Sequence, residues 1–142
     1  MRYLIRQPID VPGLTASIAA PGHGGVASFL GLVRDHHEGR TVAELEYSAY
    51  DPMAEAAIGA IVAETEVRWP VAVAVRHRLG LLAIGEVAVA VVVGGGHRAE
   101  GFDACRFVIE EIKRRVPIWK RERYADGTVA WVDPTAAESR AG

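Results

Sequence analysis

Two stretches of the chain carry apolar residues at the spacing of an amphipathic helix. Between residues 98 and 115 the apolar positions follow one another at intervals of three and four, which places them on one face of a helix. This face comprises Phe102, Cys105, Ile109, Ile112 and Val116. A second helix is predicted from Pro52 to about Arg68, where Pro70 ends it because the residue before a proline avoids the helical conformation. A shorter helix is predicted over residues 14–20.

Segments rich in β-branched and alternating apolar residues predict strands. They are Val26–Val33, Leu45–Tyr50, Val71–His77, Glu86–Val93, Ile118–Tyr124 and Thr128–Val132, with a weaker one over residues 3–5. The polar link over 34–40 contains Gly39 and predicts a hairpin-like connection between the first two strands. The strands over 71–77 and 86–93 are predicted to be antiparallel neighbours joined by a turn. Hairpins and helices without a regular strand–helix–strand alternation predict an α+β fold.

The composition is that of an ordinary folded domain. Of 142 residues, 50% are hydrophobic and 24% charged, so a single domain is predicted over 1–134, followed by a flexible tail over 135–142. The longest uncharged apolar run, over 87–96, is far shorter than the roughly 18 residues of a membrane helix. The first residues lack the apolar stretch of a secretory signal, and the single Cys105 permits neither an internal disulfide nor a cysteine-based zinc cluster. A cytoplasmic location without a membrane partner is expected.

The net charge of −2 hides one strongly basic segment. Residues 113–123 have a local charge of +5, against −7 for the rest of the chain. An acidic body with one basic strip predicts a focused anion site rather than a general nucleic-acid surface. Within the strip, Arg114 and Arg115 follow Glu110 and Glu111 by four residues, so surface ion pairs are predicted for both.

Both lysines of the chain, Lys113 and Lys120, lie in this basic strip, whereas the other 14 Lys or Arg positions are arginines. A lysine crowded by cations or partly buried can lose its proton and act as nucleophile or proton carrier, and an arginine cannot. Pro117 ends the helix and is predicted to return Lys120 toward Lys113, so that the pair can attract a phosphate. The alternative for Lys113 is an ordinary cation at a helix C-terminus, which stabilises the helix by a few tenths of a kcal/mol up to about 1 kcal/mol.

A second candidate anion site follows the glycine run over 94–96. His97 and Arg98 come directly after it and open the predicted helix over 98–115, where free amide groups and the helix dipole favour anions. A solvated turn in which His97 caps the helix is the alternative.

The other candidate ligands are less distinctive. Arg34 follows the strand over 26–33 and is either a further anion ligand or an exposed residue of the predicted hairpin. None of the five histidines shows the spacing of a helical zinc site, so no metal is predicted. His77 and Arg78 lie in a predicted strand and are assigned a structural role.

Five segments resemble, in order and spacing, the catalytic large subunit of molybdopterin synthase. They are GGVASFLGLVRDHHEGR (24–40), LEYSAYDPMAE (45–55), HRLGLLAIGE (77–86), GGGHRAEGFDAC (94–105) and KRRVPIWKRE (113–122). The last two are the most specific, because a Lys-x-x-x-Pro-x-Trp-Lys arrangement follows a His-Arg pair at a helix start. The resemblance covers residues 24–132 and implies an α/β-hammerhead fold with an additional small antiparallel β subdomain. It also implies a central homodimer that binds a small ubiquitin-like sulfur carrier at each end, which makes a heterotetramer.

The resemblance implies a sulfurtransferase without a bound cofactor or metal. Two sulfurs enter cyclic pyranopterin monophosphate to form the dithiolene of molybdopterin, and each arrives as a thiocarboxylate on the C-terminal Gly-Gly of the carrier. By the resemblance Lys113 and Lys120 are catalytic: Lys113 moves protons and polarises the thiocarboxylate, and Lys120 holds the phosphate and tunes Lys113. The implied substrate-binding residues are Leu32, Val33, Arg34, His97, Arg98, Arg121 and Glu122, with His97 and Arg98 from the same chain or from across the dimer.

The alternative function is a nucleotide- or RNA-binding module that uses the basic strip, with Trp119 and Tyr124 as stacking platforms. The acidic remainder argues against it, and no nucleic-acid partner is expected. A scaffold that only displays the carrier is a further alternative.

Two positions differ from or extend the pattern of the family. Gly101 lies inside the predicted helix, where glycine costs about 1 kcal/mol of helix stability relative to alanine. The sequence leaves open whether Arg140 reaches a neighbouring site, as a C-terminal basic residue does in the family.

Overall fold

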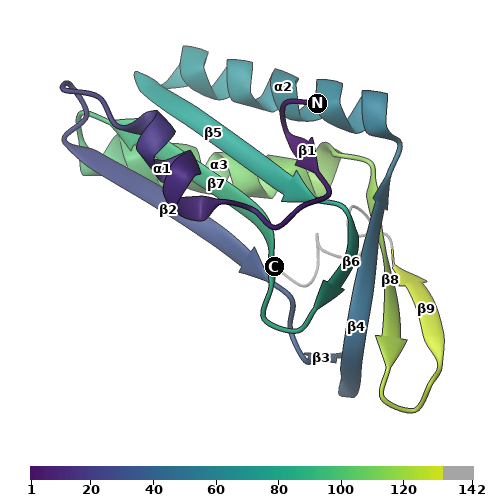
Figure 1. Ribbon diagram of the computed structural model, residues 1–142. Coiled ribbons are helices and arrows are strands. Elements are labelled where there is room, and N and C mark those ends of the chain that lie inside the picture. Colours follow the sequence, from purple (N-terminus) through teal and green to yellow (C-terminus); the bar gives the residue numbers. More distant parts are fainter. Residues whose placement is uncertain (133–142) are drawn as a thin grey trace.

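The first sheet has four strands in the spatial order β1, β5, β7, β2 (Figure 1). They span Leu4–Ile5 (β1), Val71–Arg78 (β5), Val87–Gly95 (β7) and Gly25–Leu32 (β2).

The computed structural model describes residues 1–132, so the predicted tail over 135–142, with Arg140, lies outside the described residues. Within the described residues the pairing of the first sheet is mixed. β1 runs parallel to β5, and the other neighbours are antiparallel. The predicted pairing of the strands over 71–77 and 86–93 is confirmed.

Helices cover both faces of this sheet (Figure 1). One face holds α1 (Val11–Ile18), and the other holds α2 (Asp51–Arg68) and α3 (Arg98–Arg115). The cause is the apolar sequence of β7, whose successive side chains point to opposite faces. The core beneath α2 and α3 contains Val89, Val91 and Val93, and the core beneath α1 contains Ala90 and Val92.

The two long predicted helices are confirmed within one residue, but the first helix begins earlier than predicted. α1 begins at Val11 because the Asp10 side chain accepts a hydrogen bond from the Gly13 amide at 3.1 Å and so caps it. In α3 the predicted apolar stripe is buried except for Phe102, which is 66% exposed. Phe102 borders an open groove between α3 and β2.

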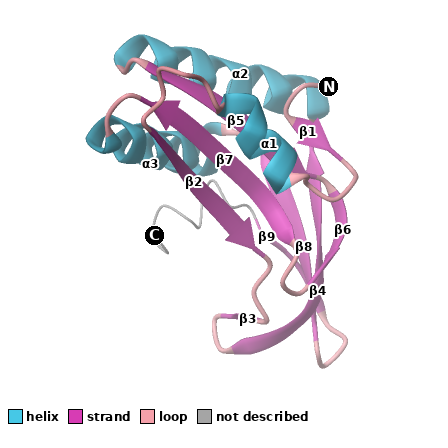
Figure 2. Ribbon diagram, turned by 60° about the vertical axis from the view of Figure 1, so that its left-hand side comes forward, coloured by secondary structure: helices cyan, strands magenta, loops and turns pink. Residues whose placement is uncertain are grey.

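The second sheet is antiparallel throughout and lies at one end of the first (Figure 2). Its strands are β3 (His36–His37), β4 (Arg40–Ala49), β8 (Ile118–Tyr124) and β9 (Val129–Val132), with β6 (Gly80–Ala83) also paired to β4. Helices packed on one sheet, with a separate antiparallel sheet beside it, confirm the α+β class.

Two predicted connections are wrong. The strands over 26–33 and 45–50 form no hairpin: β2 pairs with β7, and β4 pairs with β3, β6 and β8. The reason is that β7 is buried and needs a neighbour on each side, so it takes β2. Gly39 does make a tight turn, with φ of 77°, but this turn joins β3 to β4. The link over 79–85 is not a simple turn either, since it contains β6, where Leu82 is fully buried.

Candidate active site

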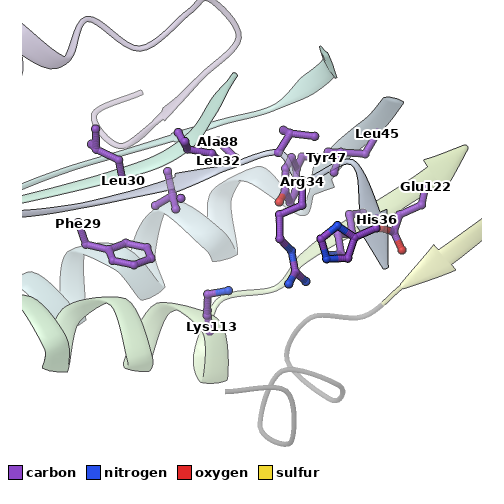
Figure 3. Close-up of a pocket in the computed structure, with 14 residues that line it drawn as sticks. Phe29, Leu30, Leu32, Arg34, His36, Leu45, Tyr47, Ala88, Lys113 and Glu122 are labelled. Carbon is purple, nitrogen blue, oxygen red and sulfur yellow. The ribbon is translucent and has the colours of Figure 1, made fainter. Parts of the chain in front are cut away.

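A pocket of about 420 Å³ lies where the two sheets meet the last turn of α3. It is bordered by Phe29, Leu30, Gly31, Leu32, Val33, Arg34, His36, Leu45, Tyr47, Ala88, Val89, Lys113, Lys120 and Glu122. Figure 3 shows the side chains of Arg34, in the link that follows β2, and Lys113, on α3, pointing into the same space. The fold thus brings together six of the nine residues that the resemblance assigns to the site.

The alternation of β8 carries Lys120 and Glu122 into this pocket. Every second residue of β8 is buried, so both side chains point to one face of the second sheet. Lys120 is 9% exposed and Glu122 is 2% exposed, although both carry ionisable groups. Tyr47 lies opposite Lys120 across the β4–β8 pair, and Leu45 lies opposite Glu122. The inner face therefore surrounds an amine and a carboxyl group with aromatic and aliphatic side chains.

Glu122 is held by two hydrogen-bonding partners. The Nδ1 atom of His37 lies 2.6 Å from Oε1 of Glu122, and the Tyr124 hydroxyl donates to the same oxygen at 3.2 Å. Burial first, and then the charge of Glu122, raises the pKa of Tyr124, so its hydroxyl keeps the proton that it donates. No local sequence pattern identifies His37, because it is 85 residues away from Glu122 and the turn between β3 and β4 brings it close.

Lys113 borders the pocket from the last turn of α3. Arg114 and Arg115, which follow it, form surface ion pairs with glutamates, as predicted. One predicted partner is wrong: Arg114 binds Glu111, because Glu110 is occupied by Arg106 at 2.9 Å. These two arginines form the ion pairs Arg114–Glu111 at 2.7 Å, Arg115–Glu111 at 3.2 Å and Arg115–Glu64 at 2.7 Å. These ion pairs hold the outer side of the last turn of α3, and Lys113 borders the pocket on its inner side.

A smaller chamber of about 60 Å³ adjoins the pocket. It shares Tyr47, Val89, Lys113 and Lys120 with the pocket and is completed by His77, Ile109, Ile112, Val116 and Ile118. The His77 ring is buried and meets the Tyr47 ring edge-on, with 5.0 Å between the ring centres. Burial, with a smaller effect from the charge of Lys113, lowers the pKa of His77 to about 4 against the opposing effect of its bond to the Arg78 carbonyl. The imidazole is therefore neutral at physiological pH.

His97 and Arg98 lie at the opposite end of α3 from the pocket. At about 1.5 Å per residue, the helix separates Arg98 from Lys113 by about 22 Å. Both side chains are exposed. His97 occupies the N-cap position and accepts the Gly101 amide through its backbone carbonyl, but its side chain makes no capping hydrogen bond. One chain therefore cannot bring these two residues to the two lysines.

The glycines before His97 are explained by packing. Gly94 and Gly95 are the last residues of β7. A Cβ on Gly94 would lie 2.5 Å from Cγ2 of Ile18 and 2.7 Å from Nδ1 of His23, and one on Gly95 would lie 3.1 Å from Cγ1 of Val71. These glycines let neighbouring segments approach β7 closely, so they require no bound anion to account for them.

Arg121 and Arg123 point to the outer face of the second sheet, away from the pocket. Each lies opposite a glutamate of β4 and forms an ion pair with it: Arg121 with Glu46 at 3.3 Å, and Arg123 with Glu44. The predicted basic strip over 113–123 is thus divided among the pocket, the outer face of the sheet and the surface of α3. It forms no single basic surface for a nucleic acid.

Two other kinds of reactive site, a metal centre and a cysteine thiolate, were sought among the described residues. Among residues 1–132 no group of three or more His, Cys, Asp or Glu side chains is arranged to hold a metal ion. The thiol of Cys105 is buried, and burial raises its pKa to about 11, so it is not a thiolate at neutral pH. No helix in this part of the chain is long and apolar enough to cross a membrane.

Comparison with known proteins agrees with the resemblance. The family model described as MoaE protein matches residues 4–115. A relative from Arabidopsis thaliana named molybdopterin synthase catalytic subunit is 43% identical over 85% of this chain, which spans 62% of that relative. The molybdopterin synthase catalytic subunit 1 of Mycobacterium tuberculosis is 43% identical over 91% of this chain and 88% of its own length. The solved structure of molybdopterin synthase from Staphylococcus aureus has a TM-score of 0.87 and 34% identity, and the match covers 92% of this chain and 95% of that one. The chain belongs to the MoaE protein family.

Proposed function

We propose that the protein is the catalytic subunit of a molybdopterin synthase, a sulfurtransferase of molybdenum cofactor biosynthesis. The observation that carries the proposal is that the two lysines of the chain, Lys113 and Lys120, border one pocket together with Arg34. A phosphate-bearing substrate and a partner with an anionic C-terminus both need such cations. The relatives named above are catalytic subunits of this enzyme.

The proposed substrates are cyclic pyranopterin monophosphate and the thiocarboxylate at the C-terminal Gly-Gly of a small ubiquitin-like carrier. In each of two rounds a carbon–sulfur bond forms on the pterin as a carbon–oxygen bond at the same carbon breaks, and the acyl carbon–sulfur bond of the carrier breaks. One displaced oxygen stays on the phosphate when its ring opens, and the other leaves as water. Water supplies the oxygen with which the carrier leaves as a carboxylate. Lys113 donates and accepts the protons of these steps. Lys120 and Arg34 bind the phosphate and stabilise the charge that develops when its ring opens.

The other assigned residues of this chain bind rather than react. Leu32 and Val33 form the apolar wall beside Arg34, and the buried Glu122 completes the polar lining beside Lys120. Arg121, on the outer face of the second sheet, is proposed to contact the carrier, since it does not border the pocket. The chemistry requires no bound cofactor or metal.

A second copy of the chain is proposed to supply His97 and Arg98, which the length of α3 keeps away from the lysines of their own chain. Strand β2 supports such an association, because it is an edge strand of the first sheet and exposes apolar side chains to between 38% and 54%. These side chains are Val26, Phe29, Leu30 and Leu32. The proposed assembly is a central homodimer with one carrier at each end, a heterotetramer.

We propose that residues 1–134 form one domain with an α/β-hammerhead fold. The proposed place of the reaction is the cytoplasm, where reducing conditions suit a thiocarboxylate donor. No observation favours the nucleotide- or RNA-binding alternative, since the basic strip is divided among several surfaces.

The test is reconstitution. The purified protein is mixed with the thiocarboxylated carrier and the cyclic pterin, and the dithiolene product is detected by mass spectrometry. The control is the same carrier with an ordinary C-terminal carboxylate, which gives no product. A folded protein that binds both substrates and forms no dithiolene contradicts the proposal.

A mixing experiment tests the two-copy site. The variants Lys113→Arg and His97→Ala/Arg98→Ala are each expected to be inactive alone. In a mixed dimer one site combines the intact Lys113 of one copy with the intact His97 and Arg98 of the other, so mixing is expected to restore activity. Failure of exchanged mixed dimers to recover activity contradicts a site shared between copies.

A further inference from the structure

His77 is a buried histidine that the proposed reaction does not use. Its ring borders the small chamber, and Lys113 and Lys120 border the same chamber and the adjoining pocket. The other residues around the chamber are aliphatic, apart from Tyr47. A polar ring therefore lies beneath the two amines, in otherwise apolar surroundings.

The hydrogen bonds of His77 determine which ring nitrogen can accept. The Nδ1 atom lies 2.9 Å from the Arg78 carbonyl oxygen. Because a carbonyl oxygen only accepts, Nδ1 carries the proton and Nε2 of the neutral ring carries a lone pair. The backbone amide of His77 donates to the carbonyl of Tyr3 at 2.8 Å, which holds the residue in β5 beside β1.

The surroundings also keep the ring neutral. Lys113 on α3 and Lys120 on β8 face the chamber, and among the described residues no carboxylate borders it, since Glu122 borders only the larger pocket. A protonated imidazole would lose its hydration and be repelled by both amines in their charged form. His77 is thus suited to accept a hydrogen bond at neutral pH rather than to act as a further cation.

We propose that His77 is a positioning residue for Lys113. A water molecule in the chamber donates a hydrogen bond to Nε2 of His77 and accepts one from the Lys113 ammonium, which holds the lysine side chain between chamber and pocket. Water fits, because it occupies about 30 Å³ in the liquid and needs about two to four polar partners. The chamber measures about 60 Å³ and has His77, Lys113 and Lys120 around it. Only the kinetic consequence, the orientation of Lys113 toward the thiocarboxylate, rests on the proposed function.

Two variants of His77 form a matched pair for the test. His77→Asn keeps a donor for the Arg78 carbonyl but is too short to bind the water, whereas His77→Gln places an amide oxygen near the position of Nε2. A second loss variant, His77→Leu, serves if the asparagine variant does not fold. Thermal unfolding establishes which variants are folded.

The first measurement needs no substrate. With two lysines in the chain, lysine labelled with ¹³C at Cε gives one NMR signal for each, assigned with Lys113→Arg and Lys120→Arg. We expect His77→Asn to shift the Lys113 signal and make that side chain more mobile, to change Lys120 less, and His77→Gln to restore the wild-type signal. An unchanged Lys113 signal, or equal changes in both variants, overturns the proposal.

The second measurement is the sulfur-transfer rate. We expect His77→Asn to lower kcat about 10- to 100-fold with unchanged KM, as a misplaced catalytic group does, and His77→Gln to stay within about fivefold of the wild type. Equal losses in both variants, or a raised KM at constant kcat, mean a merely structural role and overturn the proposal. A wild-type protein that transfers no sulfur contradicts the proposed function, while the NMR comparison still decides the role of His77.

Discussion

The two faces of strand β8 carry similar charges in different surroundings. On the inner face, Lys120 and Glu122 are almost fully buried and border the pocket. On the outer face, the side chains of Arg121 and Arg123 are 46% and 55% exposed. The opposing residues on β4 are Tyr47 and Leu45 on the inner face, and Glu46 and Glu44 on the outer face.

This difference shows that a charged residue in a sequence identifies a candidate, and burial decides what it can do. An exposed ion pair contributes about 0 to 1 kcal/mol, because water and salt screen it. A buried amine or carboxylate loses its hydration and interacts more strongly with any ligand that reaches it. The inner face of β8 therefore offers buried charged groups to a ligand, whereas its outer face carries exposed ion pairs to β4.

The largest effect is expected from Lys113→Arg, which keeps a cation beside the inner face but removes an amine that can release its proton. Sulfur transfer should fall by about 10³-fold, since a positioned proton carrier contributes about 10² to 10⁴-fold and arginine holds its proton. Single-turnover assays measure the rate, and calorimetry should show unchanged carrier binding. A variant that keeps most of the wild-type rate contradicts the proton-transfer role.

The next effect is expected from Lys120→Ala on the inner face. The partly sulfurated pterin must stay bound while a spent carrier leaves and a loaded one arrives. A charge-assisted contact to its phosphate contributes about 1.5 to 3 kcal/mol, so its loss should speed release of the intermediate by about 10- to 100-fold. After the protein is removed by ultrafiltration, mass spectrometry of the small molecules should show more of the mono-sulfur pterin relative to the dithiolene product. Equal slowing of both transfers without release would place the tether elsewhere, with Arg34 the next residue to test.

A smaller effect, on stability, is expected from Glu122→Gln. This change removes the charge that accepts hydrogen bonds from His37 and Tyr124 inside the sheet. The free energy of unfolding should fall by about 1 to 3 kcal/mol, the usual cost of disturbing a buried charged acceptor. Urea denaturation at pH 7 measures it. Tyr124→Phe, which removes one neutral donor, is the matched control with a smaller expected loss, and equal losses would contradict a special role for the carboxylate.

The smallest effect is expected from Arg123→Ala on the outer face. Loss of its exposed pair with Glu44 should change the free energy of unfolding by about 0 to 1 kcal/mol and leave sulfur transfer at the wild-type rate. Urea denaturation measures the stability, and the sulfur-transfer rate is measured for both Arg123→Ala and Lys120→Ala, so the two faces are compared directly. If Arg123→Ala slows transfer as much as Lys120→Ala does, the distinction between the faces fails.

Much of the candidate site could be predicted, and its gaps have a common cause. Lys113, Lys120 and Arg34 were found from composition, spacing and resemblance, and the pocket contains all three. Tyr47, His36 and His37 were not found. Tyr47 lies opposite Lys120 because β4 pairs with the distant β8, and this pairing also carries the β3–β4 hairpin, with His36 at the pocket and His37 at Glu122. No local pattern records such pairing.

The sequence by itself determined the features that depend on neighbouring residues. The three- and four-residue spacing determined α3, Pro70 determined where α2 ends, and the alternation along β8 determined that Lys120 and Glu122 share a face. These follow from backbone geometry, which acts over a few residues.

Only the tertiary structure decided which face is buried and which segments meet. It paired β2 with β7 instead of β4, divided the basic strip among three surfaces, and enclosed His77 beneath the lysines. It also left His97 and Arg98 one helix length away from Lys113. The physical reason is that the hydrophobic effect does not depend on how far apart two apolar segments lie in the sequence. β7 needs a neighbouring strand on each side, and the free energy of the whole fold decides which strands take these two places.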